Sequence, residues 1–154
     1  PPIVGAASLI SLGDPAQGLA GTIGNTDLNS ISSTQTAKTG EKLSFQLDVN
    51  NGAGIDYLTH VELGVNNKGL ANVASDTSII YDKFKSPQIT IIDPHKLFAD
   101  AKFVILQKDP RNGVLKFEVT FAKPMDTSDV RLLAWDINRN FVQKYYEDAI
   151  KIEK

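Results

Sequence analysis

The chain has 154 residues, of which 42% are hydrophobic and 22% are charged; this is typical of one globular domain and excludes a chain that is disordered throughout. Its 16 basic and 18 acidic residues are interspersed and give a formal net charge of -2, without the basic block expected of a protein that binds nucleic acid. The absence of cysteine excludes disulfides, thiolate metal sites and cysteine nucleophiles. No apolar run approaches the roughly 20 residues that span a bilayer.

The N-terminal region, residues 1–39, carries only three charges and is otherwise rich in small and aliphatic residues. Residues 3–12 are predicted to form an extended strand, which the turn residues Gly13, Asp14 and Pro15 end. The chain begins with two prolines and without an initiator Met. Either a leader sequence has been removed or the chain has been trimmed. We expect the first, and with it a protein that is extracellular or at a cell surface.

From residue 40 onward, apolar and polar side chains alternate with the period of two that is typical of half-buried strands. The clearest examples are residues 43–49 and 57–65. Two β-branched runs, at 77–81 and 88–92, are also predicted to be strands. Turns rich in Asn and Gly end the first two of these segments.

A β-hairpin is predicted over residues 103–121, where two alternating runs flank the turn sequence DPRNG at 109–113. The proline presets φ for the turn, and the glycine after asparagine supplies the positive φ that closes a hairpin. Residues 130–135 form a further predicted strand. The last segment, 141–153, has apolar residues at helical spacing but alternates near its end, and we favour a final strand because every other predicted element is β.

Seven to nine short strands with regular turn signals predict an all-β fold. We expect a single immunoglobulin-like or jelly-roll-type antiparallel β-sandwich with an extended N-terminal strand. Alternation of strands and helices, which would indicate a parallel α/β sheet, is missing from the pattern. The chain divides into an N-terminal strand and loop region at 1–39, a candidate for exchange with a neighbouring subunit, and a β-sandwich core at 40–154.

The sequence contains no recognisable catalytic machinery. Of its two histidines, His60 lies on the polar side of a predicted strand and His95 lies in a loop. Motifs typical of zinc proteases, α/β-hydrolases, phosphate-binding loops and dinucleotide-binding folds do not occur. We predict that the protein is not an enzyme and needs no cofactor, with calcium as the one candidate ion.

The candidate calcium ligands are Asp48, Asn50 and Asp56, in a loop that gathers oxygen-bearing side chains around glycines. Calcium accepts such oxygens with tolerant geometry. The loop does not match the spacing of an EF-hand, and loops of this composition also connect strands without any metal. Asp126 and Asp129 form a second acidic cluster, for which turn formation is the alternative.

Exposed aromatic side chains are what sugar binding on a β-sandwich usually requires, and the sequence offers few candidates. Trp135, the single tryptophan, lies in an apolar run and is predicted to be part of the core. Tyr145 and Tyr146 are adjacent, so in a strand they point to opposite faces, and one of them is predicted to be outward.

The segment at 117–130, FEVTFAKPMDTSDV, resembles a pattern found in prokaryotic immunoglobulin-like domains of surface-layer proteins, adhesins and other secreted chains. In that pattern a strand leads into Phe-x-x-Pro-Met-Asp, a small polar pair and Val. The physical roles fit: Phe121 ends a core strand, Pro124 breaks it, Met125 fills the core and Asp126 caps the turn. The family has this motif in the first half of the domain, whereas here it lies close to the end. The resemblance implies an extracellular sandwich with a structural or adhesive role.

Two functions follow as expectations. The first is a structural or assembly subunit of a filament, sheath or surface layer, with copies of itself or other cell-surface proteins as partners. An apolar N-terminal strand can complete a neighbour's sheet by β-strand addition, and a head-to-tail contact of this kind propagates; the alternative is that residues 3–12 pair within their own sandwich. The predicted assembly interface consists of Ile3, Val4, Leu9, Ile10 and Leu12. The second function is a carbohydrate-binding or adhesive module of a larger secreted protein, which requires at least two exposed aromatic side chains.

Overall fold

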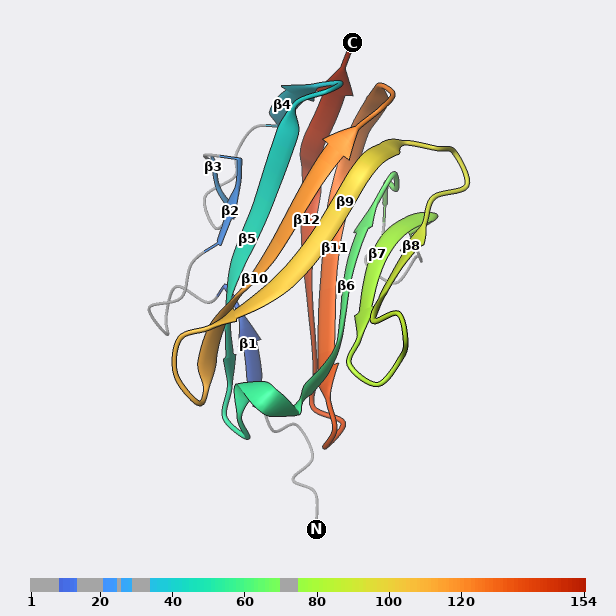
Figure 1. Ribbon diagram of the computed structural model, residues 1–154. Coiled ribbons are helices and arrows are strands. Elements are labelled where there is room, and N and C mark those ends of the chain that lie inside the picture. Colours follow the sequence, from blue (N-terminus) through green and yellow to red (C-terminus); the bar gives the residue numbers. More distant parts are fainter. Residues whose placement is uncertain (1–8, 14–20, 25, 29–33, 70–74) are drawn as a thin grey trace.

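The computed structural model describes residues 9–13, 21–24, 26–28, 34–69 and 75–154, which form two packed β-sheets (Figure 1). The first sheet, called sheet A, has the strand order β3-β2-β5-β10-β9, and β1 also pairs with β5. The second, sheet B, has the order β4-β12-β11-β6-β7-β8. The predicted all-β sandwich is confirmed. Its elements are β1 (Ile10–Leu12), β2 (Gly21–Ile23), β3 (Thr26–Asp27), β4 (Gln35–Lys38), β5 (Lys42–Asn51), the 3-10 helix η3 (Ile55–Tyr57), β6 (Leu58–Val65), β7 (Thr77–Asp82), β8 (Ile89–Ile92), β9 (Phe98–Gln107), β10 (Asn112–Phe121), β11 (Met125–Asp136) and β12 (Phe141–Glu153).

Strands β5 and β10 form the centre of sheet A, and each alternates inward and outward side chains over ten residues. The inward side chains of β5, which include Leu43, Phe45 and Leu47, are at most 5% exposed. The register pairs Phe45 with Phe117 of β10, so the inward rows of the two strands coincide. This agreement of pattern and burial is what fixes the register of the sheet.

The predicted hairpin is present as β9 and β10. Its turn is organised by Asp109, whose Oδ1 accepts the backbone N–H groups of Arg111 and Asn112, both at 2.8 Å. Strand β9 is longer than the sequence indicated, because it begins at Phe98 and continues past a bulge opposite Phe121. The result is a ten-residue strand at one edge of sheet A.

Sheet B contains the four other predicted strands and the C-terminal strand. Strand β11 starts at Met125, five residues earlier than the predicted 130–135, and Met125 is buried in the core. Strand β12 pairs with β11 in antiparallel fashion, so the expectation of a final strand is confirmed over the helical alternative. Strand β4 pairs with the end of β12, and these two strands run parallel. This pair differs from the antiparallel arrangement that the sequence predicted for the sandwich. A four-residue edge strand carries too little pattern to reveal its direction.

The N-terminal region contributes β1 to its own sandwich. Ile10, Ser11 and Leu12 pair with the end of β5 in antiparallel register, and the side chains of Ile10 and Leu12 are 2% and 1% exposed. In the described part of this region, the strand therefore pairs within its own sandwich, which is the alternative to exchange with a neighbouring subunit. Ile3 and Val4 of the predicted assembly interface lie outside the described residues.

One end of the sandwich gathers three connections, which lie together in the lower part of Figure 1. They are η3, the β7–β8 connection and the β11–β12 turn. The Ile137 N–H donates to the Tyr57 carbonyl at 2.9 Å and joins the β11–β12 turn to η3. The Lys83 ammonium group donates to the Asp56 carbonyl and joins the β7–β8 connection to η3. This end of the molecule positions the site described next.

Candidate ligand-binding site

Large hydrophobic side chains that remain exposed in the described residues fall into two sets. We call the first set the aromatic end, because it surrounds η3 and the turns at the lower end of Figure 1; its members are Leu9, Tyr57, Phe84, Trp135, Ile137 and Phe141. We call the second the edge set, because it lies on the edge strands β8 and β9; its members are Ile91, Ile92, Val104 and Leu106. Exposed apolar side chains gathered in this way mark interaction surfaces more often than isolated ones do.

The β11–β12 turn is built around Asp136, which is only 2% exposed. Its Oδ1 accepts the N–H groups of Asn138 and Asn140, both at 2.9 Å. Its Oδ2 accepts the side-chain amides of Asn140 at 2.8 Å and of Asn51 at 3.1 Å. Four donors compensate for the burial of the carboxylate, so the turn is held in one conformation and is anchored to β5 in the opposite sheet.

Trp135 lies on the outer face of sheet B and is 37% exposed, so the prediction that it belongs to the core is wrong. It is paired with His60 of β6 on one side and with Phe141 of β12 on the other. The His60 and Trp135 rings are stacked, with centroids 3.6 Å apart and planes within 2°. Because β11 lies between β6 and β12, the indole face that His60 leaves uncovered is turned toward Phe141.

A shallow cleft of about 280 Å³ lies at this uncovered face, lined by Trp135, Arg139 and Phe141. Phe141 is 49% exposed, and Arg139 sits in the turn with a positive φ of 65°. The cleft thus has two aromatic walls from neighbouring strands and a cationic group from the turn that joins them. Its volume is near the lower limit of small-ligand pockets, about 300 Å³.

Acidic groups hold the histidine behind the indole. Oε2 of Glu62 lies 3.1 Å from Nε2 of His60, and Oδ2 of Asp82 lies 3.8 Å from Nδ1. The close contact with His60 lowers the pKa of the Glu62 carboxyl more than burial raises it, and the charge of Arg131 adds to the lowering. Neither ring nitrogen of His60 has a hydrogen-bond partner of good geometry among the described residues, so the imidazole is positioned by its stack on the indole and by the nearby carboxylates.

The second acidic cluster has a structural role. Asp129 is 2% exposed and accepts the Tyr145 hydroxyl at 2.6 Å, the Asp148 N–H at 2.8 Å and the Gly69 N–H at 2.9 Å. Burial opposes its ionisation, but these three donors together lower its pKa. Burial and the hydrogen bond to Asp129 raise the pKa of Tyr145 to about 12. Tyr146 packs against the core, so Tyr145 is the outward-facing member of the pair, and its hydroxyl is occupied by Asp129.

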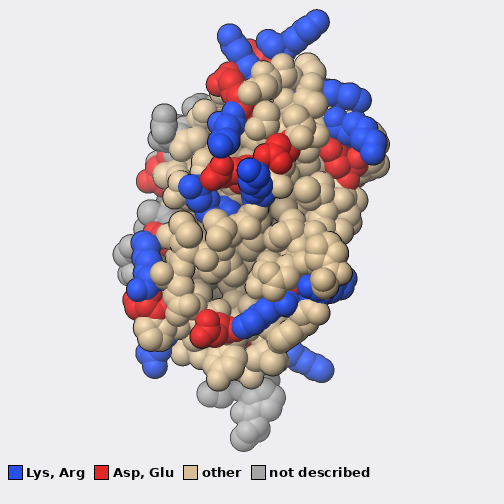
Figure 2. Space-filling view, in the orientation of Figure 1, with Lys and Arg blue, Asp and Glu red and all other residues tan. Residues whose placement is uncertain are grey.

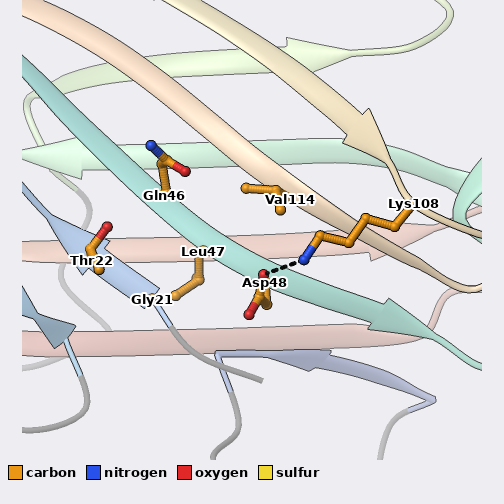
Figure 3. Close-up of a pocket in the computed structure, with 7 residues that line it drawn as sticks. All are labelled: Gly21, Thr22, Gln46, Leu47, Asp48, Lys108 and Val114. Carbon is orange, nitrogen blue, oxygen red and sulfur yellow. Dashed lines mark ion pairs between the residues drawn. The ribbon is translucent and has the colours of Figure 1, made fainter. Parts of the chain in front are cut away.

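Two of the three candidate calcium ligands, Asp48 and Asn50, have other side-chain contacts. Lys108 reaches across the outer face of sheet A to Asp48, with Nζ 3.6 Å from Oδ1, beside a recess of about 350 Å³ (Figure 3). The side-chain amide of Asn50 donates to that of Asn112 at 2.8 Å, and Asp56 lies in η3 with its side chain in solvent. The described residues include no group of three His, Asp or Glu side chains arranged to hold a metal. Calcium binding stays a prediction.

His95, the other histidine, lies in an exposed loop with Nε2 2.9 Å from Oδ2 of Asp76. The face of the molecule shown in Figure 2 carries interspersed basic and acidic side chains, with no continuous area of either sign. Within the part of the chain that the structure describes, no helix has the length and apolar composition to cross a membrane.

The remaining members of the predicted assembly interface are divided by the structure. Leu9 is 52% exposed, whereas Ile10 and Leu12 are buried within the sandwich. The carbonyl of Leu9 accepts the Gly52 N–H at 3.0 Å, so Leu9 belongs to the aromatic end. The structure thus does not present these three side chains as one surface.

No family model and no curated protein matches the chain. Among solved structures, the chain is similar to a DUF4466 family protein from Parabacteroides merdae, with a TM-score of 0.39 and 12% identity over 96% of this chain and 46% of that one. The chain thus corresponds to less than half of that protein's length.

Sequence reasoning missed His60, Arg139 and Phe141 as members of one site. The signal that could have found them is the hairpin itself: residues 135 and 141 flank a short turn and face each other in register. Pairing to β6, which brings His60 beside Trp135, joins residues 75 positions apart and is visible only once the sheet order is known.

Proposed function

We propose that this chain is a non-catalytic, extracellular β-sandwich module that binds carbohydrate at the cleft between Trp135 and Phe141. The observation that carries the proposal is the uncovered face of the indole, fixed by the His60 stack and placed opposite a second exposed aromatic ring. Of the two functions expected from the sequence, this favours the binding module, because its requirement for two exposed aromatic side chains is met on one sheet face.

The chemistry of the cleft suits a sugar ring. One face of a pyranose presents C–H groups of slight positive charge, and the face of an aromatic ring is negative. The rim of the same sugar carries hydroxyl oxygens, which can accept hydrogen bonds from the five N–H donors of Arg139. A cleft of about 280 Å³ suits one ring of a longer chain better than an entire oligosaccharide.

Preorganisation supports the same conclusion. The Asp136 carboxylate immobilises the turn, and the stack on His60 fixes the indole plane. A ligand therefore meets side chains whose conformational entropy has already been lost on folding, which improves affinity without further contacts. The alternative occupant, an apolar peptide side chain, would use the same aromatic walls but would leave the Arg139 donors without acceptors.

Binding to a panel of immobilised glycans, followed by isothermal titration calorimetry with and without calcium, tests the proposal. We expect at least one glycan to bind, and we expect W135A to reduce its affinity by tenfold or more while the circular dichroism spectrum is unchanged. I137A is the matched control, because Ile137 is 56% exposed in the same turn but does not line the cleft. If no glycan binds, or if W135A and I137A have equal effects, the carbohydrate site is wrong.

A further inference from the structure

Strand β9 forms an open edge of sheet A. It pairs with β10 on one side, and none of the described strands pairs with its other side. The strand is ten residues long and runs along the full length of β10. A long edge strand of this kind presents a row of unpaired N–H and C=O groups to any strand that can lie beside it.

The hairpin shows which residues of β9 direct their backbone N–H and C=O groups toward the unpaired side of the strand. The N–H of Lys108 donates to the carbonyl of Asn112 at 2.8 Å. Since successive residues of an antiparallel ladder alternate in direction, the even-numbered residues of β9 bond to β10. The odd-numbered residues Ala101, Phe103, Ile105 and Gln107 then present their N–H and C=O groups to the open side.

The solvent-facing side chains of β9 protect this edge only in part against pairing with another strand. Asp100 and Lys102 lie in the first half of the strand and are within 3.8 Å of each other. The second half presents Val104 and Leu106, each 46% exposed. The neighbouring edge strand β8 adds two exposed isoleucines to the same side of the sandwich. Natural proteins protect exposed edge strands with charge, proline, bulges or short length, and the outward side chains of β9 carry charge only in its first half.

We propose that β9 pairs with β9 of a second copy of this chain, antiparallel about a two-fold axis at Val104, so that sheet A continues across the dimer. In this register Val104 lies opposite the partner's Val104. Lys102 lies opposite the partner's Leu106, where its aliphatic stem covers the leucine. Asp100 lies opposite the partner's Lys108, whose exposed ammonium group would exchange its contact with Asp48 for this ion pair, and symmetry makes the pair occur twice.

Charge complementarity selects this register over its neighbours. A shift of the axis to residue 105 places Lys102 against the partner's Lys108, and a shift to residue 102 places Lys102 against its own copy. Like charges directly opposite one another destabilise a strand pair. A shift to residue 103 avoids repulsion but loses both ion pairs with Asp100. Of these four registers, only the axis at Val104 places Asp100 opposite a lysine without placing like charges opposite each other.

The symmetry of the contact determines what it builds. A two-fold pairing uses the same edge on both copies, so it is closed and produces a dimer instead of a filament. The contact is independent of the aromatic end, because β9 lies in the other sheet. A test that disproves the dimer therefore leaves the carbohydrate site untouched, and the reverse also holds.

The first test measures the mass of V104K by sedimentation equilibrium across protein concentration. We expect the wild-type chain to dimerise as its concentration rises. V104K places two ammonium groups face to face at the axis and should weaken the dimer by tenfold or more. I137K is the matched control, because it adds the same charge at an exposed position far from β9 and should dimerise as the wild type does. A wild-type chain that is monomeric throughout, or a V104K chain that dimerises equally well, overturns the proposal.

The second test fixes the register by cross-linking, which is simple because the chain has no cysteine. Opposed residues in a non-hydrogen-bonded pair have Cα atoms about 4.5 Å apart, within the range of about 4.4–6.8 Å that a disulfide spans. V104C should form a disulfide-linked dimer under mild oxidation. L106C alone should not, but an equal mixture of K102C and L106C should. Equal cross-linking of V104C and L106C would show that the register is wrong.

Discussion

The two sets of exposed apolar side chains differ in what the backbone beneath them is doing. At the aromatic end, Trp135 sits on a strand that is paired on both sides, with β6 and β12, so only side chains are available to a ligand. At the edge set, Val104 sits on a strand with one free side, so the backbone itself is available. Similar exposed fractions, 37% and 46%, therefore support different kinds of contact: a small ligand in the first case and another strand in the second.

The largest change in the free energy of unfolding is expected at Asp136, which holds the β11–β12 turn of the aromatic end. D136A removes the acceptor of four hydrogen bonds and leaves buried donors unpaired, so we expect unfolding to become easier by about 3 kcal/mol, together with loss of glycan binding. Urea denaturation measures the change. D126A is the control, because Asp126 is exposed on the same strand and should change stability by less than about 0.5 kcal/mol. Equal stabilities of D136A and D126A would show that the turn does not depend on this carboxylate.

A smaller loss of stability is expected at Tyr145, and it should leave both glycan binding and dimerisation unchanged. Y145F removes the hydroxyl that donates to the buried Asp129 and should cost about 1.5 kcal/mol, the value typical of hydrogen bonds to charged groups. Tyr145 lies on sheet B, outside both the cleft lining and β9. Glycan affinity and dimerisation should therefore be unchanged in Y145F, and a tenfold loss of either would contradict the division of the surface into two independent sites.

Tyr145 and its neighbour Tyr146 predict how the stability of the protein depends on alkaline pH. Burial is the main cause that raises the pKa of Tyr145 and of Tyr146 to about 12, from an ordinary value of 10.0. Because the folded pKa values are the higher ones, the stabilisation is complete below pH 10 and is lost as the pH rises toward 12. Urea denaturation between pH 9 and 12 should show this decline, and the decline should be shallower in Y145F. Parallel curves for the two chains would contradict the assignment.

The smallest effect concerns the support behind the indole. E62Q removes the carboxylate that contacts His60 and should cost about 0.5–1 kcal/mol, because the pair is partly buried. The pKa of Glu62 is lowered in the folded chain, so its stabilisation is present above the unfolded pKa and is lost as pH falls through the folded value. Stability measured between pH 3 and 7 should therefore depend on pH less steeply in E62Q than in the wild type, and an unchanged slope would show that this contact is not formed.

Much of the fold could be predicted because its strands are half-buried. Where one face packs on the core and the other meets water, as in β5, the sequence alternates and the strand is visible. The hairpin was predictable for a different reason, since its turn chemistry is local to residues 109–113. The parallel pairing of β4 with β12 was not, because four residues carry no signal of direction.

Trp135 shows why the candidate site was harder to predict. Leu132, Leu133 and Ala134 are all buried, although Leu133 faces outward, in phase with Trp135. The alternation is therefore hidden in this strand, and an apolar run of this kind is predicted to lie in the core. Neighbours on the outer face cover Leu133 but not the tryptophan, and those neighbours are set by sheet order, which a single strand does not encode.

The central claim, that the uncovered face of Trp135 binds a sugar ring, can be tested by intrinsic fluorescence because Trp135 is the single tryptophan. Titration with the best glycan from the panel should shift or quench the emission along a saturable curve. V104K, altered only at the β9 edge, should give the same curve, and the titration should match the affinity from calorimetry. A glycan that binds with unchanged tryptophan emission would place the binding site elsewhere and contradict the account.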